Sequence, residues 1–414
     1  MHARRSRLAL LALSFVASGC AAPEEAPLYT PYVPEEGTAE RIAYDEGLTR
    51  YLGTARPTET RTLMDGTVSY AFDPADGPVC MRGAVYRTSV RDTESEDLLI
   101  FLQGGGACWS DFCLAVTGAP AGIPATDLLR DAETNPLSGW DVLYLPYCDG
   151  SLFAGDNEVD EDGDGAADRL HHGLANLSAA LTMGHQHFPT PRRIVLAGSS
   201  GGAYGTILAA FLVRYVYPGV PIDVLNDAGI GLAREGDHAF LDRLIDEFGA
   251  RDFLPDDCAE CTADGHITGL VDYLLDRDPD VRVAAISSWY DYVISELFLM
   301  ETAEEFQAAL QSETTALHEE HADRYRRFIY QGAAHTALLG DPTGIIGRDL
   351  GAVELPPNIS EALSRLTLES LTTATVNGVT LDVWVRAMIA RDDAAWSDLV
   401  SEPGTPPMPP MTME

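Results

Sequence analysis

A serine flanked by glycines follows a short apolar run near the middle of the chain. Gly198-Ser199-Ser200-Gly201-Gly202 fits the pattern Gly-x-Ser-x-Gly, after apolar Ile194–Leu196 and before the apolar stretch Ala203–Tyr217. A strand, a glycine-rich turn and a helix in this order are typical of a nucleophile elbow, which exposes the serine hydroxyl near a helix N-terminus. We therefore predict Ser200 as a nucleophile. Ser199 is the alternative register, and a turn without chemistry is the other interpretation.

A serine nucleophile needs a histidine base and an acid that orients the base. His335 follows an aromatic apolar run and a glycine, and we expect it to be the base. Among the other histidines, His171, His172, His185 and His187 precede the serine, while His318 and His321 lie in a charged stretch typical of a surface helix. Asp291 also follows an apolar run and is the expected acid. Asp227 has a similar setting and is the alternative, either as the acid or as a group that supports the elbow.

The developing oxyanion needs hydrogen-bond donors. Gln103-Gly104-Gly105-Gly106 follows the apolar run Asp97–Leu102, and glycines let the backbone approach a substrate closely. We expect the backbone amides of Gly105, Gly106 and Gly201 to form the oxyanion hole. A tight turn with only a structural role is the alternative.

The elements that must position these residues alternate between apolar runs and helical patterns. This alternation predicts an α/β fold with a mostly parallel central sheet and helices on both faces. In such sheets the loops at the carboxyl ends of the strands carry the chemistry. We expect one domain over residues 61–400, with strands at these runs: Val68–Phe72, Gly83–Arg87, Asp97–Leu102, Asp141–Leu145, Ile194–Leu196, Ile222–Leu225, Val283–Ser287 and Tyr325–Tyr330.

The two ends of the chain have the composition of segments outside the domain. Residues 1–19 combine three arginines with the short apolar run Leu8–Val16, and small residues precede Cys20. This pattern is similar to a bacterial lipoprotein signal, with Cys20 as the lipidated first residue; an ordinary secretory signal is the alternative. We expect residues 20–60 to be a Pro/Glu-rich tether and residues 401–414 a disordered Pro-rich tail. The protein would then be exported and lipid-anchored to the bacterial cell envelope.

The chain is strongly acidic. It has 64 acidic and 27 basic residues, which gives a formal charge of −37, and every basic residue is Arg. Without the leader and its three arginines, 24 basic residues remain against 64 acidic ones, and the charge is −40. Such a surface repels nucleic acid and anionic lipid headgroups. We therefore expect no nucleic-acid partner, membrane contact through the lipid anchor only, and a monomer.

Six cysteines remain after Cys20, and an even number in an exported chain predicts three disulfides. Their spacing alone leaves 15 pairings open. Cys258-x-x-Cys261 has acidic neighbours, which would raise a thiol pKa, and the chain has no second Cys-x-x-Cys. A zinc or redox site is therefore not expected.

Taken together, these segments resemble the ordered blocks of the pectinacetylesterase/Notum family. The blocks are FLQGGGACW at 101–109, LPYCDGSLFAGD at 145–156, VLAGSSGGAYG at 195–205, LNDAG at 225–229, SSWYDYV at 287–293 and GAAHTAL at 332–338. The resemblance implies an α/β-hydrolase fold, metal-free hydrolysis of carboxylic esters, a triad of Ser200, Asp291 and His335, and an oxyanion hole from Gly105, Gly106 and Gly201. It also implies the disulfides Cys80–Cys148, Cys108–Cys113 and Cys258–Cys261. Gln103 and Gly201 stand where the family usually has Glu and Ala.

An acidic insert at 157–168 also departs from the family pattern. Asp160-x-Asp162-x-Asp164-Gly165 and then Asp168 offer oxygen ligands on alternate loop residues, as a hard cation requires. The twelfth position of an EF-hand would be His171, so the insert is not an EF-hand. It is similar to the short calcium loops of exported bacterial proteins. We expect a structural Ca²⁺ near the mouth of the active site, and a solvated acidic loop is the alternative.

These residues predict an exported serine carboxylesterase that works through an acyl-enzyme, without a catalytic cofactor. Its negative charge favours an acetylated neutral glycan or a small ester at least as much as polyanionic pectin. The alternative is a catalytically silent, calcium-stabilised surface lipoprotein that binds glycans or envelope partners. A peptidase on the same fold is a further alternative.

Overall fold

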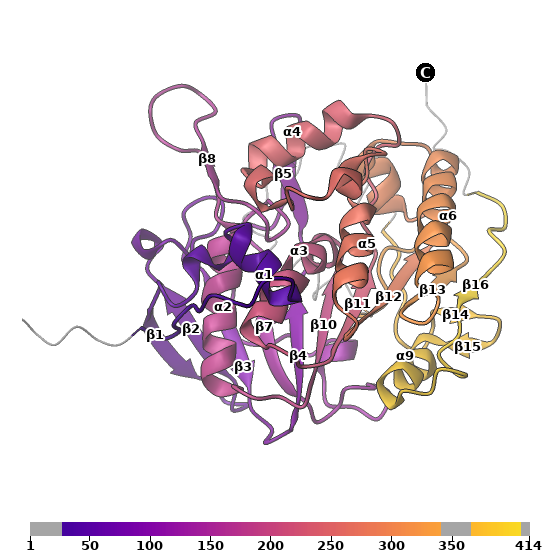
Figure 1. Cartoon of the computed structure of the whole chain (residues 1–414), viewed down its shortest axis with the longest axis horizontal. Coiled ribbons are helices and arrows are strands. Elements are labelled where there is room, and N and C mark those ends of the chain that lie inside the picture. The colour runs from indigo at the N-terminus through magenta and orange to yellow at the C-terminus, as the bar shows by residue number, and fades with distance from the viewer. Residues whose placement is uncertain (1–26, 341–365, 407–414) are drawn as a thin grey trace, which may run out of the picture.

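A twisted sheet of ten strands runs through the molecule in the computed structural model, which describes residues 27–340 and 366–406 (Figure 1). The strand order is β1-β2-β3-β7-β4-β10-β11-β12-β13-β16. The strands are β1 (Pro57–Thr62), β2 (Val68–Phe72), β3 (Arg87–Arg91), β4 (Asp97–Leu102), β7 (Asp141–Leu145), β10 (Arg193–Ser199), β11 (Ile222–Asp227), β12 (Val281–Ser288), β13 (Tyr325–Tyr330) and β16 (Leu399–Val400). Short hairpins pair β5 (Gly106–Trp109) with β6 (Phe112–Ala115), β8 (Asn157–Val159) with β9 (Arg169–His171), and β14 (Thr375–Val376) with β15 (Val379–Thr380).

The sheet is mostly parallel. The strands from β7 to β16 pair in parallel, whereas β1, β2, β3 and β7 form an antiparallel end. Every residue of β4, β7, β11 and β12 is buried, as expected of strands covered on both faces. The predicted strands β2, β4, β7 and β13 have the predicted bounds. The strand expected at 83–87 begins only at Arg87, because residues 81–83 form a turn and Val85 makes only an isolated bridge to Val79.

Helices cover both faces of this sheet. Alternate residues of β4 belong to two separate apolar clusters, Leu98 and Ile100 to one and Leu99 and Phe101 to the other. The first cluster packs under six helices and the second under α9. The helices are α1 (Ala39–Asp45), α2 (Gly173–His187), α3 (Gly201–Val216), α4 (His238–Phe248), α5 (Thr268–Arg277), α6 (Ala303–Glu320) and α9 (Leu381–Ala390). This arrangement confirms the predicted α/β-hydrolase fold class.

The folded unit begins before the expected boundary at residue 61. Leu48 and Leu52 are buried in the first apolar cluster, and α1 packs against α3. The Tyr32 ring stacks on Tyr215 at 4.7 Å between centroids, and its backbone N–H donates to the Tyr215 hydroxyl at 2.7 Å. The described part of the expected tether is therefore docked on the domain. Its Pro/Glu-rich composition suggested a tether, but its tyrosines provide the apolar and hydrogen-bonding contacts.

The C-terminal segment also contacts the domain as far as it is described. The Ser401 N–H donates to the Ile329 carbonyl at 2.9 Å, and the Trp289 indole donates to the Ser401 carbonyl at 2.8 Å. The Tyr290 hydroxyl donates to the Gly404 carbonyl at 3.3 Å. The disordered tail expected over 401–414 is therefore ordered over 401–404, directly after the edge strand β16. Residues 407–414, like Cys20 and the leader at 1–19, lie outside the described residues.

Three disulfides join Cys80 to Cys148, Cys108 to Cys113 and Cys258 to Cys261. These are the pairs that the family resemblance implies. Cys80–Cys148 links the segment before β3 to the loop after β7, and Cys108–Cys113 closes the β5–β6 hairpin. Within 27–340 and 366–406, no helix combines the length and the hydropathy needed to cross a bilayer.

Candidate active site

Ser200 stands between the end of β10 and the start of α3. Its backbone has φ 57° and ψ −126°, a left-handed conformation that is rare for a residue with a side chain and is typical of a strained functional turn. A Cβ on Gly198 would lie 2.3 Å from the Gly202 carbonyl oxygen, and one on Gly202 would lie 2.1 Å from the Leu102 carbonyl oxygen. Both positions therefore require glycine, and together they permit the sharp turn of a nucleophile elbow.

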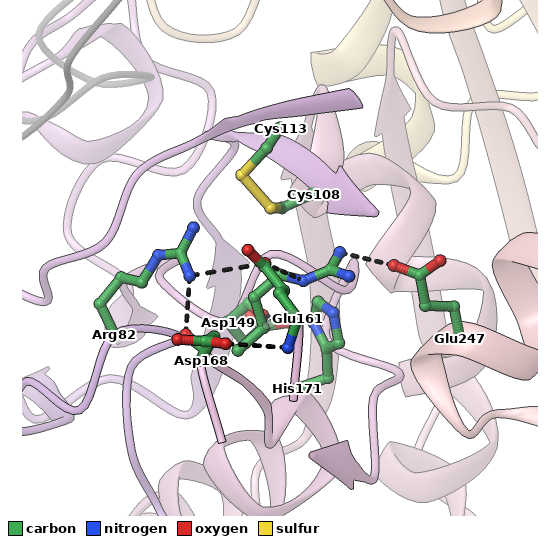
Figure 2. Close-up of a disulfide and its surroundings, with 9 residues drawn as sticks. Arg82, Cys108, Cys113, Asp149, Glu161, Asp168, His171 and Glu247 are labelled. Carbon is green, nitrogen blue, oxygen red and sulfur yellow. Dashed lines mark hydrogen bonds and ion pairs between the residues drawn. A yellow bond between two sulfur atoms is a disulfide. The ribbon is translucent and has the colours of Figure 1, made fainter. Parts of the chain in front are cut away.

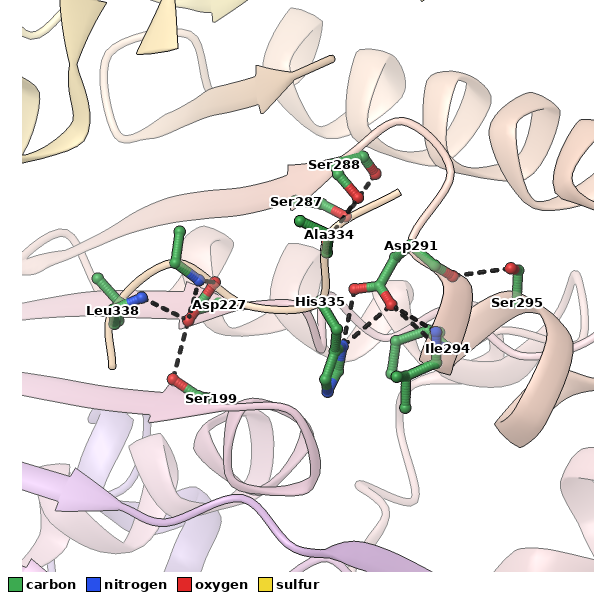
Figure 3. Close-up of polar contacts among 12 residues, drawn as sticks. Ser199, Asp227, Ser287, Ser288, Asp291, Ile294, Ser295, Ala334, His335 and Leu338 are labelled. Carbon is green, nitrogen blue, oxygen red and sulfur yellow. Dashed lines mark hydrogen bonds and ion pairs between the residues drawn. The ribbon is translucent and has the colours of Figure 1, made fainter. Parts of the chain in front are cut away.

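His335 and Asp291 form a buried pair after the last two long strands. The His335 Nδ1 lies 2.9 and 3.0 Å from the two carboxylate oxygens of Asp291 (Figure 3). The Asp291 carboxylate also accepts from the backbone N–H groups of Val293 and Ile294, each at 3.0 Å, which fixes its orientation. His335 Nε2 is buried and has no hydrogen-bond partner among the described residues. The imidazole therefore has one nitrogen held by a carboxylate and the other left for a reacting group.

Asp227, the alternative acid, has a different set of partners. Its carboxylate accepts from the Ser199 hydroxyl at 2.8 Å and from the N–H groups of Ala337 and Leu338 at 3.0 Å (Figure 3). Its backbone carbonyl accepts from the Ser200 N–H at 2.8 Å. Asp227 thus connects the serine turn to the loop that carries His335. Ser199, with its hydroxyl on Asp227, does not occupy the elbow position.

Burial raises the pKa of Asp227 to about 6, although the Leu338 and Ala337 N–H groups and the Ser199 hydroxyl act in the opposite direction. The carboxylate is fully buried, and the low local dielectric disfavours its charged form. The contact between the serine turn and the histidine loop therefore depends on a group that titrates close to physiological pH.

The glycines predicted as oxyanion donors lie against the serine turn. A Cβ on Gly104 would lie 2.9 Å from the Ser200 Cβ, and one on Gly201 would lie 2.8 Å from the Gly106 carbonyl oxygen. The Gly105 carbonyl accepts from the Val116 N–H at 2.8 Å, which ties this loop to the end of β6. The backbone from Gly104 to Gly106 thus meets the N-terminus of α3, as the predicted oxyanion hole requires.

A small apolar pocket of about 30 Å³ opens beside these groups. Ser200, Gly106 and Gly201 lie at one side, and apolar side chains form the rest. Those side chains belong to Ala107, Phe112, Leu114, Leu152, Tyr204, Val293, Ile294, Leu297 and Phe298. An uncharged group next to an ester carbonyl fits such a pocket, whereas a charged group would be desolvated without a partner.

Sequence reasoning missed the strained residues beside this pocket. Leu152 and Phe153 have φ of 59° and 62°, and the buried Asp149 carboxylate accepts from the Phe153 N–H at 3.1 Å and from the N–H and hydroxyl of Ser151 at 3.0 and 2.6 Å. Asp149-Gly150-Ser151 is a turn signal in the sequence, but nothing local indicates left-handed backbone at a leucine and a phenylalanine.

The acidic insert forms the β8–β9 hairpin, whose loop projects from the body of the molecule beyond β8 (Figure 1). Carboxylate oxygens of Asp160, Asp162 and Asp168 lie within 4.8 Å of one another, and Asp164 is not in this group. The Asp160 carboxylate accepts from the N–H groups of Gly163 and Gly165, which lower its pKa. Three of the four predicted calcium ligands thus come together, a donor set that fits a hard cation.

The base of this hairpin is joined to α4. Arg169 bridges Glu161 and Glu247, each at 2.5 Å, while Arg82 donates to the Asp168 carbonyl at 2.7 Å (Figure 2). The Asp156 N–H also donates to the carbonyl of Phe248, the last residue of α4, at 2.8 Å. The insert therefore supports the helix that covers the region next to the active-site pocket.

Residues 122–246, which include the nucleophile elbow and the acidic insert, match the family model described as pectinacetylesterase. This match supports, over that part of the chain, the family resemblance of the sequence blocks. No curated protein matches the chain significantly.

Proposed function

We propose that this chain, whose residues 122–246 match the pectinacetylesterase family model, is a carboxylic ester hydrolase that removes O-acetyl groups from a glycan or a small ester through Ser200, His335 and Asp291. The observation that supports this proposal most strongly is the buried His335–Asp291 pair, whose free Nε2 is the atom that a general base would use. The strained elbow at Ser200 and the adjoining glycines support it as well.

The proposed reaction has two steps. His335 Nε2 takes the proton from the Ser200 hydroxyl as Oγ attacks the ester carbonyl, and the N–H groups of Gly105, Gly106 and Gly201 stabilise the oxyanion. The alcohol leaves with the proton from His335, so that an acetyl group remains on Oγ. Water then gives a proton to His335 and attacks the acetyl group. Acetate leaves, and the proton returns to Ser200. Asp291 holds the imidazole in the tautomer that exposes Nε2 as an acceptor.

Charge favours a neutral glycan over pectin. The mature chain carries about 40 negative charges in excess, which repel a polygalacturonate backbone at low salt. A neutral acetylated polysaccharide meets no such repulsion. A lipid on Cys20, added when the lipoprotein-like leader is removed, would hold the enzyme at the cell envelope, where polymeric substrates are accessible.

We also propose that the β8–β9 hairpin binds Ca²⁺ with Asp160, Asp162 and Asp168. The close approach of these carboxylates supports the site. The ion would neutralise their repulsion and stabilise the hairpin, and no step of the hydrolysis would pass through it.

Acetate release from acetylated xylan and from acetylated pectin tests the substrate proposal. We expect serine-dependent release from xylan at all salt concentrations, and release from pectin that is weak at low salt and rises as salt screens the charges. Faster release from pectin as salt is lowered would contradict the charge argument. Release that Ser200→Ala leaves unchanged would contradict the mechanism.

A further inference from the structure

A second, larger apolar cavity lies directly behind the pocket at Ser200. It measures about 90 Å³, against about 30 Å³ for the pocket. The cavity lies between α3, α4 and α5, and nearly all of its lining is apolar. An unfilled apolar cavity lowers the stability of a fold. Its position next to the serine therefore indicates a role in binding the substrate.

Three residues line both the pocket and the cavity: Leu152, Tyr204 and Phe298. We call them the dividing wall. We propose that this wall sets the acyl length of the substrate: it confines the wild-type enzyme to acetyl and similarly short acyl groups, and it closes off a cavity that could otherwise hold a medium-length alkyl chain. This inference rests on the proposed esterase function and adds the residues that determine its acyl specificity.

The aromatic part of the dividing wall is held in place. The Tyr204 hydroxyl donates to the Leu232 carbonyl at 2.6 Å, and its ring lies 5.4 Å from that of Phe298. Phe298 in turn makes an edge contact with Trp109 at 5.5 Å. Because both rings are buried and have fixed neighbours, neither turns aside easily to admit a long chain.

Leu152 is the part of the wall that contacts the residue after the nucleophile. Its Cδ2 would lie only 3.3 Å from a Cβ on Gly201, the residue after the nucleophile. The buried Asp149 holds the turn around it, and the Leu152 N–H donates to the Tyr147 hydroxyl at 3.2 Å. These contacts keep Leu152 at φ 59°, so that its side chain lies at the boundary between pocket and cavity.

The volumes agree with this division. A water-sized sphere needs roughly 10–15 Å³. The pocket of about 30 Å³ is a small space, and the cavity of about 90 Å³ offers about three times as much. A medium-length acyl group such as octanoyl would need both spaces, and it could reach the cavity only through the wall.

The test compares hydrolysis of p-nitrophenyl acetate and octanoate by the full-length enzyme and two variants. Leu152→Gly removes the side chain and suits the left-handed backbone, whereas Phe298→Ala opens the wall from another element. We expect the wild type to prefer acetate by at least about tenfold in kcat/KM, and each variant to raise the octanoate-to-acetate ratio by about tenfold or more. Leu241→Ala, which enlarges the cavity without touching the pocket, should leave the wild-type ratio unchanged.

The outcomes separate this inference from the esterase itself. Suppose that Ser200→Ala abolishes hydrolysis but that both wall variants keep the wild-type octanoate-to-acetate ratio. This result would overturn the role of the dividing wall and leave the esterase function intact. Wild-type activity on octanoate equal to that on acetate would also overturn it. Serine-independent hydrolysis would overturn both proposals. Filling the cavity with Ala233→Leu in the Leu152→Gly enzyme should restore the acetate preference.

Discussion

At the scale of single residues, two buried aspartates have separate sets of partners that their sequence settings do not distinguish. Asp227 is the last residue of β11, and Asp291 comes shortly after β12. Only Asp291 contacts the His335 imidazole, while Asp227 contacts Ser199 and the backbone beyond His335. We therefore expect Asp291 to orient the base and Asp227 to hold two loops together.

Asp291→Asn should lower kcat by about 10⁴-fold, because an amide cannot hold the imidazole in the required tautomer as the carboxylate does. Steady-state kinetics on p-nitrophenyl acetate measures the loss. Asp227→Asn is the matched control and should cost far less activity. An Asp227→Asn loss as large as that of Asp291→Asn would reverse the two assignments.

Asp227 should also make stability depend on pH. Its folded pKa of about 6 lies above its ordinary value of 3.8, so the folded state binds a proton that the unfolded state has released. The stabilising contribution is fully present only below the unfolded pKa of 3.8 and is lost as pH rises through about 6. The wild type should therefore lose about 2 kcal/mol relative to Asp227→Asn between pH 4 and pH 7. Urea unfolding of both proteins across this range measures the difference, and a constant difference would contradict the raised pKa.

The catalytic motif was predictable because its chemistry is local. The turn from Gly198 to Gly202 needs glycines at fixed positions whatever the surrounding fold, so the motif can be read from the sequence. The order of serine, acid and histidine along the chain supports the same assignment. The left-handed Leu152 was not predictable, since its conformation depends on the carboxylate of Asp149 and the hydroxyl of Tyr147. Those contacts become visible only when the β7 loop has folded against α3.

At the scale of elements, buried strands were the easiest to predict and docked termini the hardest. The run Asp97–Leu102 is apolar apart from its first residue, and it forms β4 with those bounds. The N-terminal segment was misjudged because proline and glutamate dominate its composition, whereas the contact of Tyr32 with Tyr215 decides its place. A few aromatic contacts between residues far apart in sequence thus outweigh composition.

The disulfides should differ in their effect on stability. Cys80–Cys148 closes a long loop, with a sequence separation of 68, and Cys258–Cys261 a short one, with a separation of 3. From the chain entropy of the unfolded state, removal of the first pair should cost about 4 kcal/mol and removal of the second about 2 kcal/mol. Paired Cys→Ala variants under urea unfolding test this order. Equal losses would show that the long loop is already constrained in the unfolded chain.

Calcium should stabilise the β8–β9 hairpin and, through Arg169 and Glu247, the end of α4. Saturating CaCl₂ should raise Tm by several degrees, since a ligand at about 100 times its Kd adds about 2.7 kcal/mol to folding. The paired variant Asp160→Asn/Asp162→Asn should remove the effect. MgCl₂ at the same ionic strength is the control. The same rise with both salts, or a rise that the variant retains, would indicate ionic screening without a site.

At the scale of the whole molecule, repulsion among the excess acidic residues lowers the stability of the folded state. A net charge of −37 on 414 residues gives mutual repulsion that salt screens. We expect Tm to rise by several degrees from 20 mM to 500 mM NaCl in the presence of a calcium chelator. A lower Tm at high salt would mean that ion pairs such as Arg214–Asp278 outweigh the repulsion.

The architecture places the reactive groups at one edge of the sheet. Ser200, Asp227, Asp291 and His335 lie at or just after the carboxyl ends of the parallel strands β10 to β13, so they gather at the same edge of the sheet. The sheet and its helices provide the rigid frame, and the loops provide the chemistry. This separation is why a mostly parallel sheet with polar residues at its carboxyl edge could be predicted from the sequence, while the pocket walls could not.

Hydrolysis of p-nitrophenyl acetate by the mature domain and by Ser200→Ala tests the central claim most directly. The account predicts turnover by the wild type, and a loss of at least about 10³-fold in the variant with unchanged Tm. Labelling of the wild type at Ser200 by a fluorophosphonate, located by peptide mass, should accompany it. Equal turnover by both proteins, or no turnover and no labelling by a folded wild type, would contradict the serine esterase.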